Sequence, residues 1–390
     1  MSEANRDFET LIGPDRRRPR SPGPLGIAVI VVAAVTLLGL IVLWPRGAPQ
    51  LDLSLVGFPD QVVRAEIVQV VHNPCSFDAQ FDCVTYRFDL LDEPVGEIVI
   101  LEFSDEPGQP VLVEDEKVYL SVVELEDGSI DYQYAGKDRV LLLGVLALAF
   151  GATVVALGRM RGVAALIGLA LSVAILLWFI LPAIVAGSDA VLVAAVGGSA
   201  ILLVSLYLAH GPNPLTHSAA LGALIALVLT TLLSWLVVEL ANFTGLASEE
   251  SFFLLAVPDL DLNGLLLAGI VLGAIGALDD VTVTQASAVL EVHQANPELG
   301  RSALYDSGIR VGRDHIVSTV NTLLLAYAGA SLPLLIFFTL ANQSLGFVAS
   351  TEVVAVEVVR TLVGSMGLVA AVPVTTWLSS RVVGWRQSSQ

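Results

Sequence analysis

The chain has 390 residues, of which 55% are hydrophobic and only 15% are charged, and its mean hydropathy is +0.77. Soluble domains carry roughly 25% charged residues, so the composition excludes an ordinary soluble protein and predicts an α-helical polytopic membrane protein that contacts the lipid bilayer. The net charge of −19 argues against nucleic acid as a partner, because phosphate binding requires basic patches.

The amino-terminal region is predicted to be a disordered cytoplasmic tail, residues 1–24, followed by a transmembrane anchor, residues 25–44. The tail is polar and carries arginines at positions 16, 17, 18 and 20, which favours the cytoplasmic side. The anchor supplies about 20 apolar residues, enough to cross a bilayer about 30 Å thick. A cleaved signal peptide is the alternative, but the apolar run is longer than an h-region and no A-x-A-like site closes it.

Residues 49–138 are predicted to form a small, acidic, β-rich domain outside the cytoplasm. Between positions 51 and 138 there are 20 Asp and Glu against four Lys and Arg, a balance of −16. Period-two alternation between Asp, Pro and Gly turns predicts five strands, at residues 61–71, 84–91, 96–103, 116–125 and 131–134. Five short strands indicate a small barrel or sandwich, and an OB-like barrel is one such form.

Both cysteines of the chain, Cys75 and Cys83, lie in this domain. An extracytoplasmic compartment permits disulfides, and an even number of cysteines favours pairing. We therefore expect a disulfide between them, with two free thiols as the alternative. A metal site fits less well, because the cysteines lack the close C-x-x-C spacing.

Residues 139–380 are predicted to form a seven-helix transmembrane core, with a cytoplasmic tail at 381–390. The apolar segments are residues 140–158, 163–186, 191–209, 219–242, 264–283, 316–340 and 353–378. With the anchor they make eight spans and place both termini in the cytoplasm. The positive-inside rule agrees with this orientation. The arginines on the predicted inner side are Arg159, Arg161, Arg301, Arg310, Arg313, Arg381 and Arg386.

Two connections have content of their own. Residues 248–257 begin with a serine and two glutamates, a helix-start pattern, and are too short to span, so they are predicted to form a re-entrant or interfacial helix. Residues 297–312 are interpreted as a solvated connector between the two central helices.

The strongest functional signal is the pair of aspartates within the helix at 264–283. Ionisable groups at membrane depth are costly and usually face a bundle interior or a wet cavity. Gly269, Gly273, Gly276 and Asp280 share one helix face, and small residues mark faces packed on another helix. Asp280 is therefore predicted to face a neighbouring helix, whereas Asp279, about 100° around the helix, faces elsewhere.

The next helix, predicted to begin at Arg313, Asp314 and His315, completes a candidate transport or ion site. Its predicted members are Asp280, Asp279, Thr284, Ser287, Ser318, Asn321 and Thr322. Carboxylate and hydroxyl oxygens suit hard cations, so a bound cation or a proton is the expected occupant and no other cofactor is predicted. The alternative is that these groups, with an Asp280–Arg313 ion pair, only hold the helices together. His293 and His315 lie near the acidic residues and could tune their protonation.

Further charge partners are predicted on both helices after the aspartates. Arg313 and Asp314 begin the first, and Glu357 and Arg360 are spaced i, i+3 on one face of the last helix. The Glu357–Arg360 pair is interpreted either as structural or as an outer gate that fits alternating access. His210 and His217 are expected to be solvated on the inner side.

Enzymatic functions fit the sequence poorly. Asp280 and Asp314 could share a proton as aspartic proteases do, but Ala277 interrupts the Gly-x-Gly-Asp motif expected of an intramembrane form. The sequence has no G-x-S-x-G, H-E-x-x-H or P-loop motif. We therefore predict a gradient-driven permease for a small ion or solute. The alternative is a scaffold or sensor whose acidic outer domain binds a cell-envelope protein, with a homo-oligomer as a further possible assembly.

Three core motifs resemble the YibE/F-like family of bacterial multi-pass membrane proteins. They are GAIGALDDVTVTQASAVLEV at 273–292, SGIRVGRDHIVSTVNTLLLAYAGASLPLL at 307–335 and VGSMGLVAAVPVTT at 363–376. The order of the parts is similar too, including YAGKDR at 134–139. The resemblance implies a multi-helix architecture in a bacterial cytoplasmic membrane, and it implies no particular activity.

Overall fold

The computed structural model describes residues 23–47, 61–76, 78, 80–125, 128–258 and 260–385. Most of the predicted tail at 1–24, and residues 386–390, lie outside these ranges. The chain divides into two compact units, one made of residues 50–153 and the other of residues 1–49 and 154–390. Each unit is described by itself.

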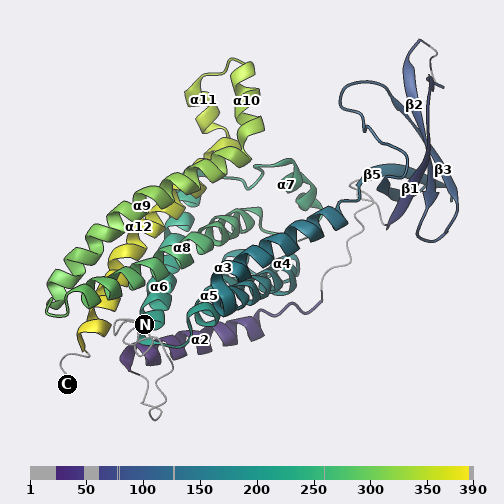
Figure 1. The fold of residues 1–390 in the computed structure, drawn as a ribbon. Helices are drawn as coiled ribbons and strands as arrows, with labels where there is room; N and C mark the ends of the chain where they lie inside the picture. Colours follow the sequence, from purple (N-terminus) through teal and green to yellow (C-terminus); the bar gives the residue numbers. More distant parts are fainter. Residues whose placement is uncertain are drawn as a thin grey trace. The chain divides into compact units, whose positions relative to one another are not determined.

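The first unit is a five-stranded antiparallel sheet that curls into a half-barrel (Figure 1). Its strands are β1 (Gln61–Pro74), β2 (Asp82–Leu90), β3 (Ile98–Ser104), β4 (Lys117–Glu124) and β5 (Ile130–Lys137), in the order β3-β2-β1-β4-β5. All five predicted strands are confirmed, and so is the β-rich class of this domain. The OB-like form stays a prediction.

Alternation of side chains builds the core of this sheet. On β2, Val84, Tyr86, Phe88 and Leu90 are buried and point to one face, as the two-residue period of a strand requires. They pack against buried residues of β1 and β4, among them Ile67 and Leu120. The core therefore lies on the concave side of the half-barrel.

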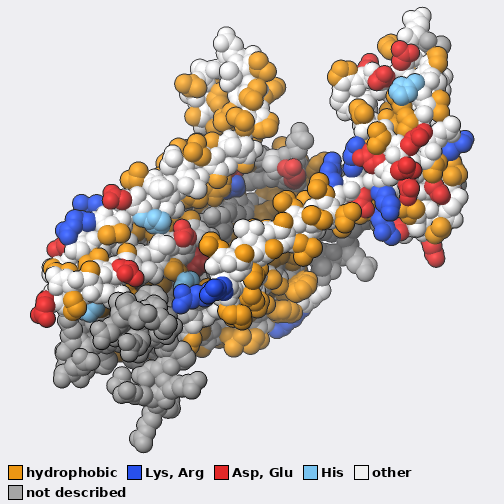
Figure 2. Space-filling model, viewed as in Figure 1, with side chains coloured by type: hydrophobic (Ala, Val, Ile, Leu, Met, Phe, Trp, Pro, Cys, Tyr) orange, Lys and Arg blue, Asp and Glu red, His pale blue; other side chains and the backbone are white. Residues whose placement is uncertain are grey.

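A buried disulfide and an exposed ion pair link parts of this unit. Cys75 at the end of β1 and Cys83 at the start of β2 form a disulfide, so the structure pairs the two thiols. The Arg64 guanidinium lies 2.7 Å from a carboxylate oxygen of Asp92. That contact lowers the pKa of the Asp92 carboxyl below its ordinary value, through hydrogen bonds from the Arg64 side chain and backbone N–H. Figure 2 shows the acidic side chains that cover this unit.

The second unit is a helical bundle. Its long helices are α2 (Pro24–Val42), α5 (Ala190–His210), α6 (Pro214–Ala241), α8 (Leu262–Ala295), α9 (Arg301–Ala330) and α12 (Glu352–Trp385). α6, α8 and α12 pack on one another at its centre, while α5 and α2 flank one side and α9 contacts α8 and α12 (Figure 1). The main core combines buried alanines, valines and leucines of α5, α6, α8 and α12 with Phe179 and Ile180.

A reversal of the chain interrupts the long helix α3 (Val140–Ile175), which is followed by the π-helical turn η2 (Leu176–Ile180) and α4 (Leu181–Val185). Arg159 has φ 50° and ψ −129°, which are not helical values. A Cβ on Gly162 would lie 2.5 Å from the carbonyl oxygen of Val154, whereas residues eight apart in a straight helix are separated by about 12 Å. The break therefore falls between the two segments predicted at 140–158 and 163–186.

The helix after the aspartates differs from the prediction at both ends. It begins at Arg301 and not at Arg313, so residues 301–312 are its first three turns and not a connector. They are helical because Leu304, Gly308 and Gly312 are buried against the bundle. The helix then ends at Ser331, and α10 (Leu332–Leu340) continues after a bend of 63°. Pro333 explains the break, since proline cannot donate a backbone hydrogen bond and clashes with the preceding turn.

Short helices fill two connections. α7 (Glu249–Phe253) and the 3-10 turn η3 (Leu254–Ala256) occupy the predicted helical piece at 248–257, and α7 begins at Ser248, whose side chain accepts a hydrogen bond from the Ser251 N–H. α11 (Leu345–Ser350) follows α10, and Figure 2 shows apolar side chains over both α10 and α11.

Six helices of the described chain are long and apolar enough to cross a membrane, and seven if the bent pair α9 and α10 is one span. The six are α2, α5, α6, α8, α12 and the stretch from Val140 to Val185 counted as one. The structure thus contains a multi-helix unit with apolar spans and a small β unit near the amino terminus. Eight separate spans remain a prediction.

Glycines allow the central helices α6 and α12 to pack closely. A Cβ on Gly222 of α6 would lie 3.3 Å from the Cα of Thr375 on α12, with the Thr375 side chain closer still. A Cβ on Gly367 of α12 would likewise press on the side chain of Thr230 of α6. Small residues therefore let these two helices approach each other at two levels, as in helix pairs within membranes.

We expect Gly222→Ala to lower the melting temperature of the detergent-purified protein, because the new methyl group would push on the α12 backbone. Overpacking of this kind typically costs about 1–3 kcal/mol. The matched control is Gly276→Ala on α8, where a Cβ meets nothing within 4 Å. That control should be neutral or stabilising, since alanine favours a helix over glycine. Equal melting temperatures for the two variants would contradict the packing described for α6 and α12.

We also expect Arg64→Gln to lower thermal stability at pH 7 by a small amount, and to have no effect once Asp92 is protonated. The pKa of Asp92 is lowered in the folded protein, so its contribution is complete above the pKa of the unfolded chain and is lost as the pH falls through the folded pKa. Melting curves at pH 7 and below pH 3 (roughly a unit below the ordinary Asp value) measure this. A difference that persists at the lower pH would contradict it.

Candidate functional site

Helix α8 has two contrasting faces. One carries large apolar residues that are buried in the main core, including Val271, Ile275 and Leu278. The other carries Gly269, Gly273 and Gly276, which are half-buried or exposed. The glycine face was predicted to pack on a neighbouring helix, and this prediction is wrong. Buried apolar side chains form the packed face, and the glycines leave room for two long side chains that reach across from other helices.

Those two side chains are Tyr327 of α9 and Arg360 of α12. A Cβ on Gly273 would lie 2.7 Å from the Tyr327 hydroxyl oxygen, and one on Gly269 would lie 3.7 Å from a guanidinium nitrogen of Arg360. The Arg360 guanidinium lies 5.8 Å from the centre of the Tyr327 ring, within the range of a cation–π contact. The absence of side chains on α8 therefore makes space for a polar group from each neighbour.

Arg360 also forms the ion pair that its i, i+3 spacing from Glu357 favours. A guanidinium nitrogen lies 2.7 Å from a Glu357 carboxylate oxygen, and each side chain is 26% exposed. The Nε of Arg360 is buried and has no hydrogen-bond partner among the described residues. This cation is thus only partly satisfied by the contacts around it.

Asp280 lies on the same face of α8, two turns beyond Gly273. Its side chain is 63% exposed, and a carboxylate oxygen lies 3.9 Å from Nε2 of His315 on α9. The same His315 nitrogen is 3.2 Å from the Thr284 hydroxyl. Asp280 therefore faces the neighbouring helix α9, as predicted, but it belongs to an open polar group and not to a closely packed face.

Asp279 is the aspartate that is inserted between helices. It is half-buried, and its carboxylate accepts a hydrogen bond of 2.6 Å from the Ser205 hydroxyl of α5. The sequence predicts that Asp279 lies on a different side of α8 from Asp280, and this is confirmed, but it does not predict that the Asp279 side is the one inserted between helices. The 100° step between adjacent residues does separate the two carboxylates, but it turns Asp279 toward the bundle and Asp280 toward the open side.

These groups form a continuous feature that we call the open seam. It consists of Gly269, Gly273, Gly276, Asp280 and Thr284 on α8, His315 and Tyr327 on α9, and Glu357 and Arg360 on α12. From Gly269 to Thr284 the helix rises about 22 Å at 1.5 Å per residue. Thr284 of α8 contacts His315 of α9, whereas Gly273, which comes earlier on α8, lies beside Tyr327, which comes later on α9. The two helices are therefore antiparallel.

Gln285 closes one end of the seam. Its amide nitrogen is buried and donates hydrogen bonds to the Gly308 carbonyl of α9 at 2.9 Å and to the Thr376 hydroxyl of α12 at 2.7 Å. Gly308 and Gly312 let α9 approach: a Cβ on Gly312 would lie 2.5 Å from a methyl group of Val372. Three helices therefore meet at this one side chain.

Several predicted members of the site are not gathered with Asp280. Ser318, Asn321 and Thr322 are exposed on α9, and the Thr322 hydroxyl donates to the Ser318 carbonyl of its own helix. Arg313 and Asp314 are exposed and form no ion pair within the described part of the chain. The basic neighbour of Asp280 is His315 and not Arg313, because Arg313 lies on a different side of α9.

Ser287 belongs to a separate pocket of about 250 Å³ near the turn between α5 and α6. Arg161, His210, Asn213, Ser287 and Glu291 supply its polar lining. His217 was expected to be solvated, but it is half-buried and its Nδ1 lies 2.6 Å from the Tyr207 hydroxyl. No group of three or more potential metal ligands occurs among the described residues.

Ser205, Gln285 and Tyr327 were not predicted as members of the site. Each bonds or contacts a residue on another helix, and no spacing rule within one helix identifies such a partner. Burial of Gln285 could have been predicted, because it lies seven residues after Leu278 and so on the same apolar face of α8. Ser205 and Tyr327 carried no such signal.

The β unit, the apolar spans and the polar seam together define a helical protein of the multi-pass type. A family model described as YibE/F-like protein matches residues 146–385. The chain therefore belongs to the YibE/F-like family, as the resemblance of its core motifs indicated. A search of curated proteins and a search of solved structures each found no match.

We expect Gln285→Leu to destabilise the protein by about 1–3 kcal/mol, since it removes two buried interhelical hydrogen bonds, to the Gly308 carbonyl and the Thr376 hydroxyl, each worth about 0.5–1.5 kcal/mol. Gln294→Leu is the matched control on the same helix, because the Gln294 side chain makes no hydrogen bond among the described residues. Thermal unfolding in detergent measures both. If the two substitutions lowered the melting temperature equally, the Gln285 contacts would not be holding α9 in place.

Proposed function

We propose that this protein is a gradient-driven permease for a small ion or solute in a bacterial cytoplasmic membrane. The observation that carries the proposal is the length of the open seam. Its charged and hydroxyl groups are spread over about 22 Å of α8, a large part of a hydrocarbon core about 30 Å thick. An interaction that only held two helices together would need polar groups at one depth along the helices and not at several.

The proposed topology has eight spans with both termini in the cytoplasm and the β unit outside. Seven candidate spans are counted when α9 and α10 are one. The reversal at Arg159 supports dividing the stretch from Val140 to Val185 into two, which makes eight. In this arrangement Arg159 and Arg161 lie on the cytoplasmic side, as the positive-inside rule favours.

Two levels of the seam have different roles in this proposal. Asp280, Thr284 and His315 form the site on the cytoplasmic half, where a carboxylate and a hydroxyl suit a hard cation and an imidazole can accept a proton. Glu357, Arg360 and Tyr327 lie toward the outer half and act as a gate. Polar and ionisable groups at both levels would let the solute be bound from either side in turn, as alternating access requires.

A scaffold or sensor is the second candidate. The acidic β unit favours it, because this unit is separate, carries its own core and contains a pocket of its own. The two functions differ in what damages them. A sensor depends on the β unit and tolerates Asp280→Asn, whereas a permease does not tolerate that substitution.

We expect a ligand of the permease to raise the melting temperature of the wild type and not of Asp280→Asn. The panel comprises mono- and divalent cations and amino acids at several pH values. A ligand present at about 100 times its dissociation constant stabilises the folded state by about 2.7 kcal/mol. Asp306→Asn is the matched control, since Asp306 is an exposed aspartate of α9 outside the seam.

The same ligand should enter proteoliposomes that contain the wild type or Asp306→Asn, and not those with Asp280→Asn. A shift that survives in Asp280→Asn, together with undiminished uptake, would remove Asp280 from the site. Loss of the shift in both aspartate variants would point to charge alone and would contradict the proposal.

The topology can be tested with single cysteines, because the two natural cysteines are paired in a disulfide. Gln343→Cys, between α10 and α11, should react with an impermeant maleimide added outside intact cells. Ser302→Cys, at the start of α9, should react only after the membrane is opened. Both positions are exposed, so a reversed pattern would contradict the proposed orientation.

A further inference from the structure

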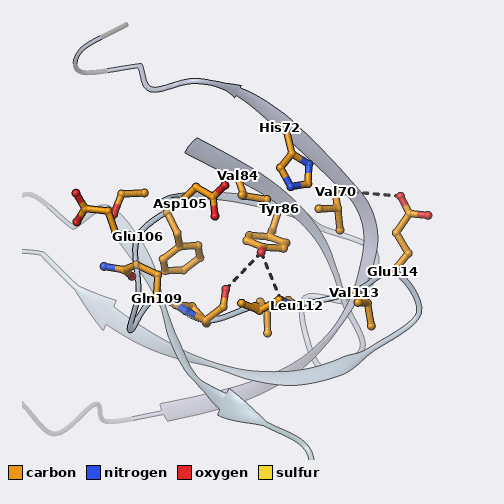
Figure 3. A pocket seen from close by; sticks show the side chains of 14 residues that line it. Val70, His72, Val84, Tyr86, Asp105, Glu106, Gln109, Leu112, Val113 and Glu114 are labelled. Carbon is orange, nitrogen blue, oxygen red and sulfur yellow. Dashed lines mark hydrogen bonds between the residues drawn. The ribbon is translucent and has the colours of Figure 1, made fainter. Parts of the chain in front are cut away.

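The concave side of the β unit contains a pocket of about 420 Å³ (Figure 3). Its floor is apolar and aromatic, with Tyr86 and Phe103 from β2 and β3 and Val70 from β1. The Tyr86 and Phe103 rings lie 5.8 Å apart with their planes at 59°. The volume falls within the range of about 300–1,000 Å³ that is typical of small-molecule sites.

The other wall is the segment after β3, and its position is fixed by hydrogen bonds. The Tyr86 hydroxyl donates to the Pro110 carbonyl at 3.3 Å and accepts from the Leu112 N–H at 3.4 Å. The Glu114 carboxylate accepts from the Val70 N–H at 3.3 Å. Figure 3 shows these contacts joining the segment to the sheet. The cavity is therefore formed before any ligand arrives.

The walls of the pocket expose apolar surface together with negative charge. Val111 and Val113 are 79% and 60% exposed, although valine side chains are usually buried. Asp105, Glu106 and Glu114 lie among the lining residues, and the lining contains no lysine or arginine. An anion would be repelled here, and a neutral apolar molecule would leave the carboxylates without a counterpart.

We propose that this pocket binds a small organic cation with an apolar body, such as an aryl- or alkyl-substituted amine. The ammonium group would lie among the carboxylates of Asp105, Glu106 and Glu114, and the apolar body would lie against Tyr86, Phe103 and the two exposed valines. Aromatic rings pack favourably against an aryl group, and carboxylates attract an ammonium group. The proposal is independent of the open seam and of transport.

The test uses the full-length protein in nanodiscs of zwitterionic lipid, with empty nanodiscs as the blank, and isothermal titration of three matched probes. The probes are 2-phenylethylammonium, 2-phenylethanol and phenylacetate, which share a ring and differ in charge. We expect saturable binding of the ammonium, binding of the alcohol weaker by about fivefold or more, and no binding of the carboxylate. Binding of the ammonium should weaken with added salt, because exposed charges are screened.

Variants separate the two parts of the site. Asp105→Asn combined with Glu106→Gln should weaken binding of the ammonium about two- to thirtyfold, the range expected when two exposed ion pairs are lost. Phe103→Leu keeps the apolar volume and should weaken it about two- to fivefold, since the ring of the probe loses its aromatic partner. Glu124→Gln, an exposed carboxylate at the end of β4 and outside the pocket, should leave the affinity unchanged.

Four results would overturn the proposal. They are equal affinity for the ammonium and the alcohol, saturable binding of phenylacetate, an unchanged affinity in the double variant, and no saturable heat with any probe. All the substituted carboxylates are exposed, so the variants should fold, and their melting temperatures check that they do.

Discussion

The helical unit depends on one buried amide. Gln285 cannot be left unpaired in apolar surroundings, because an unsatisfied amide costs several kcal/mol. Its two hydrogen bonds fix the level at which α8, α9 and α12 meet, and the glycines of α9 allow that meeting. Along the glycine face of α8 the contacts with α9 and α12 are made by long side chains, among them Tyr327 and Arg360. The open seam thus begins where the close contact of the three helices at Gln285 ends.

Much of the fold followed from periodicity. The five strands were predictable because alternation and turn residues are local signals, and the apolar helices because their length is set by composition. The ends of α9 were not predictable from apolar runs. Its first turns are polar in sequence and helical only because Leu304, Gly308 and Gly312 are buried by tertiary contacts. The bend near Ser331 did have a local cause in Pro333, which the continuous apolar run concealed.

The candidate site shows where helical spacing stops being informative. Spacing correctly placed Gly273 and Asp280 on one face and Asp279 on another. It could not tell which face was packed, because a stripe of glycines is compatible both with a close backbone and with inserted side chains. Ser205 donates a hydrogen bond to Asp279 from another helix, and nothing in the sequence distinguishes it from the other hydroxyl residues of α5. Glu357 and Arg360 are three residues apart on one helix, so their ion pair could be predicted from the sequence.

The β unit is inserted into the chain of the helical unit, which continues on both sides of it. An inserted domain has two covalent attachments, where an appended domain has one. A conformational change that alters the distance between the two ends of this unit would therefore act on two helices, α2 before it and α3 after it. For the same reason its local concentration near the helical unit is fixed by two connections and not by one.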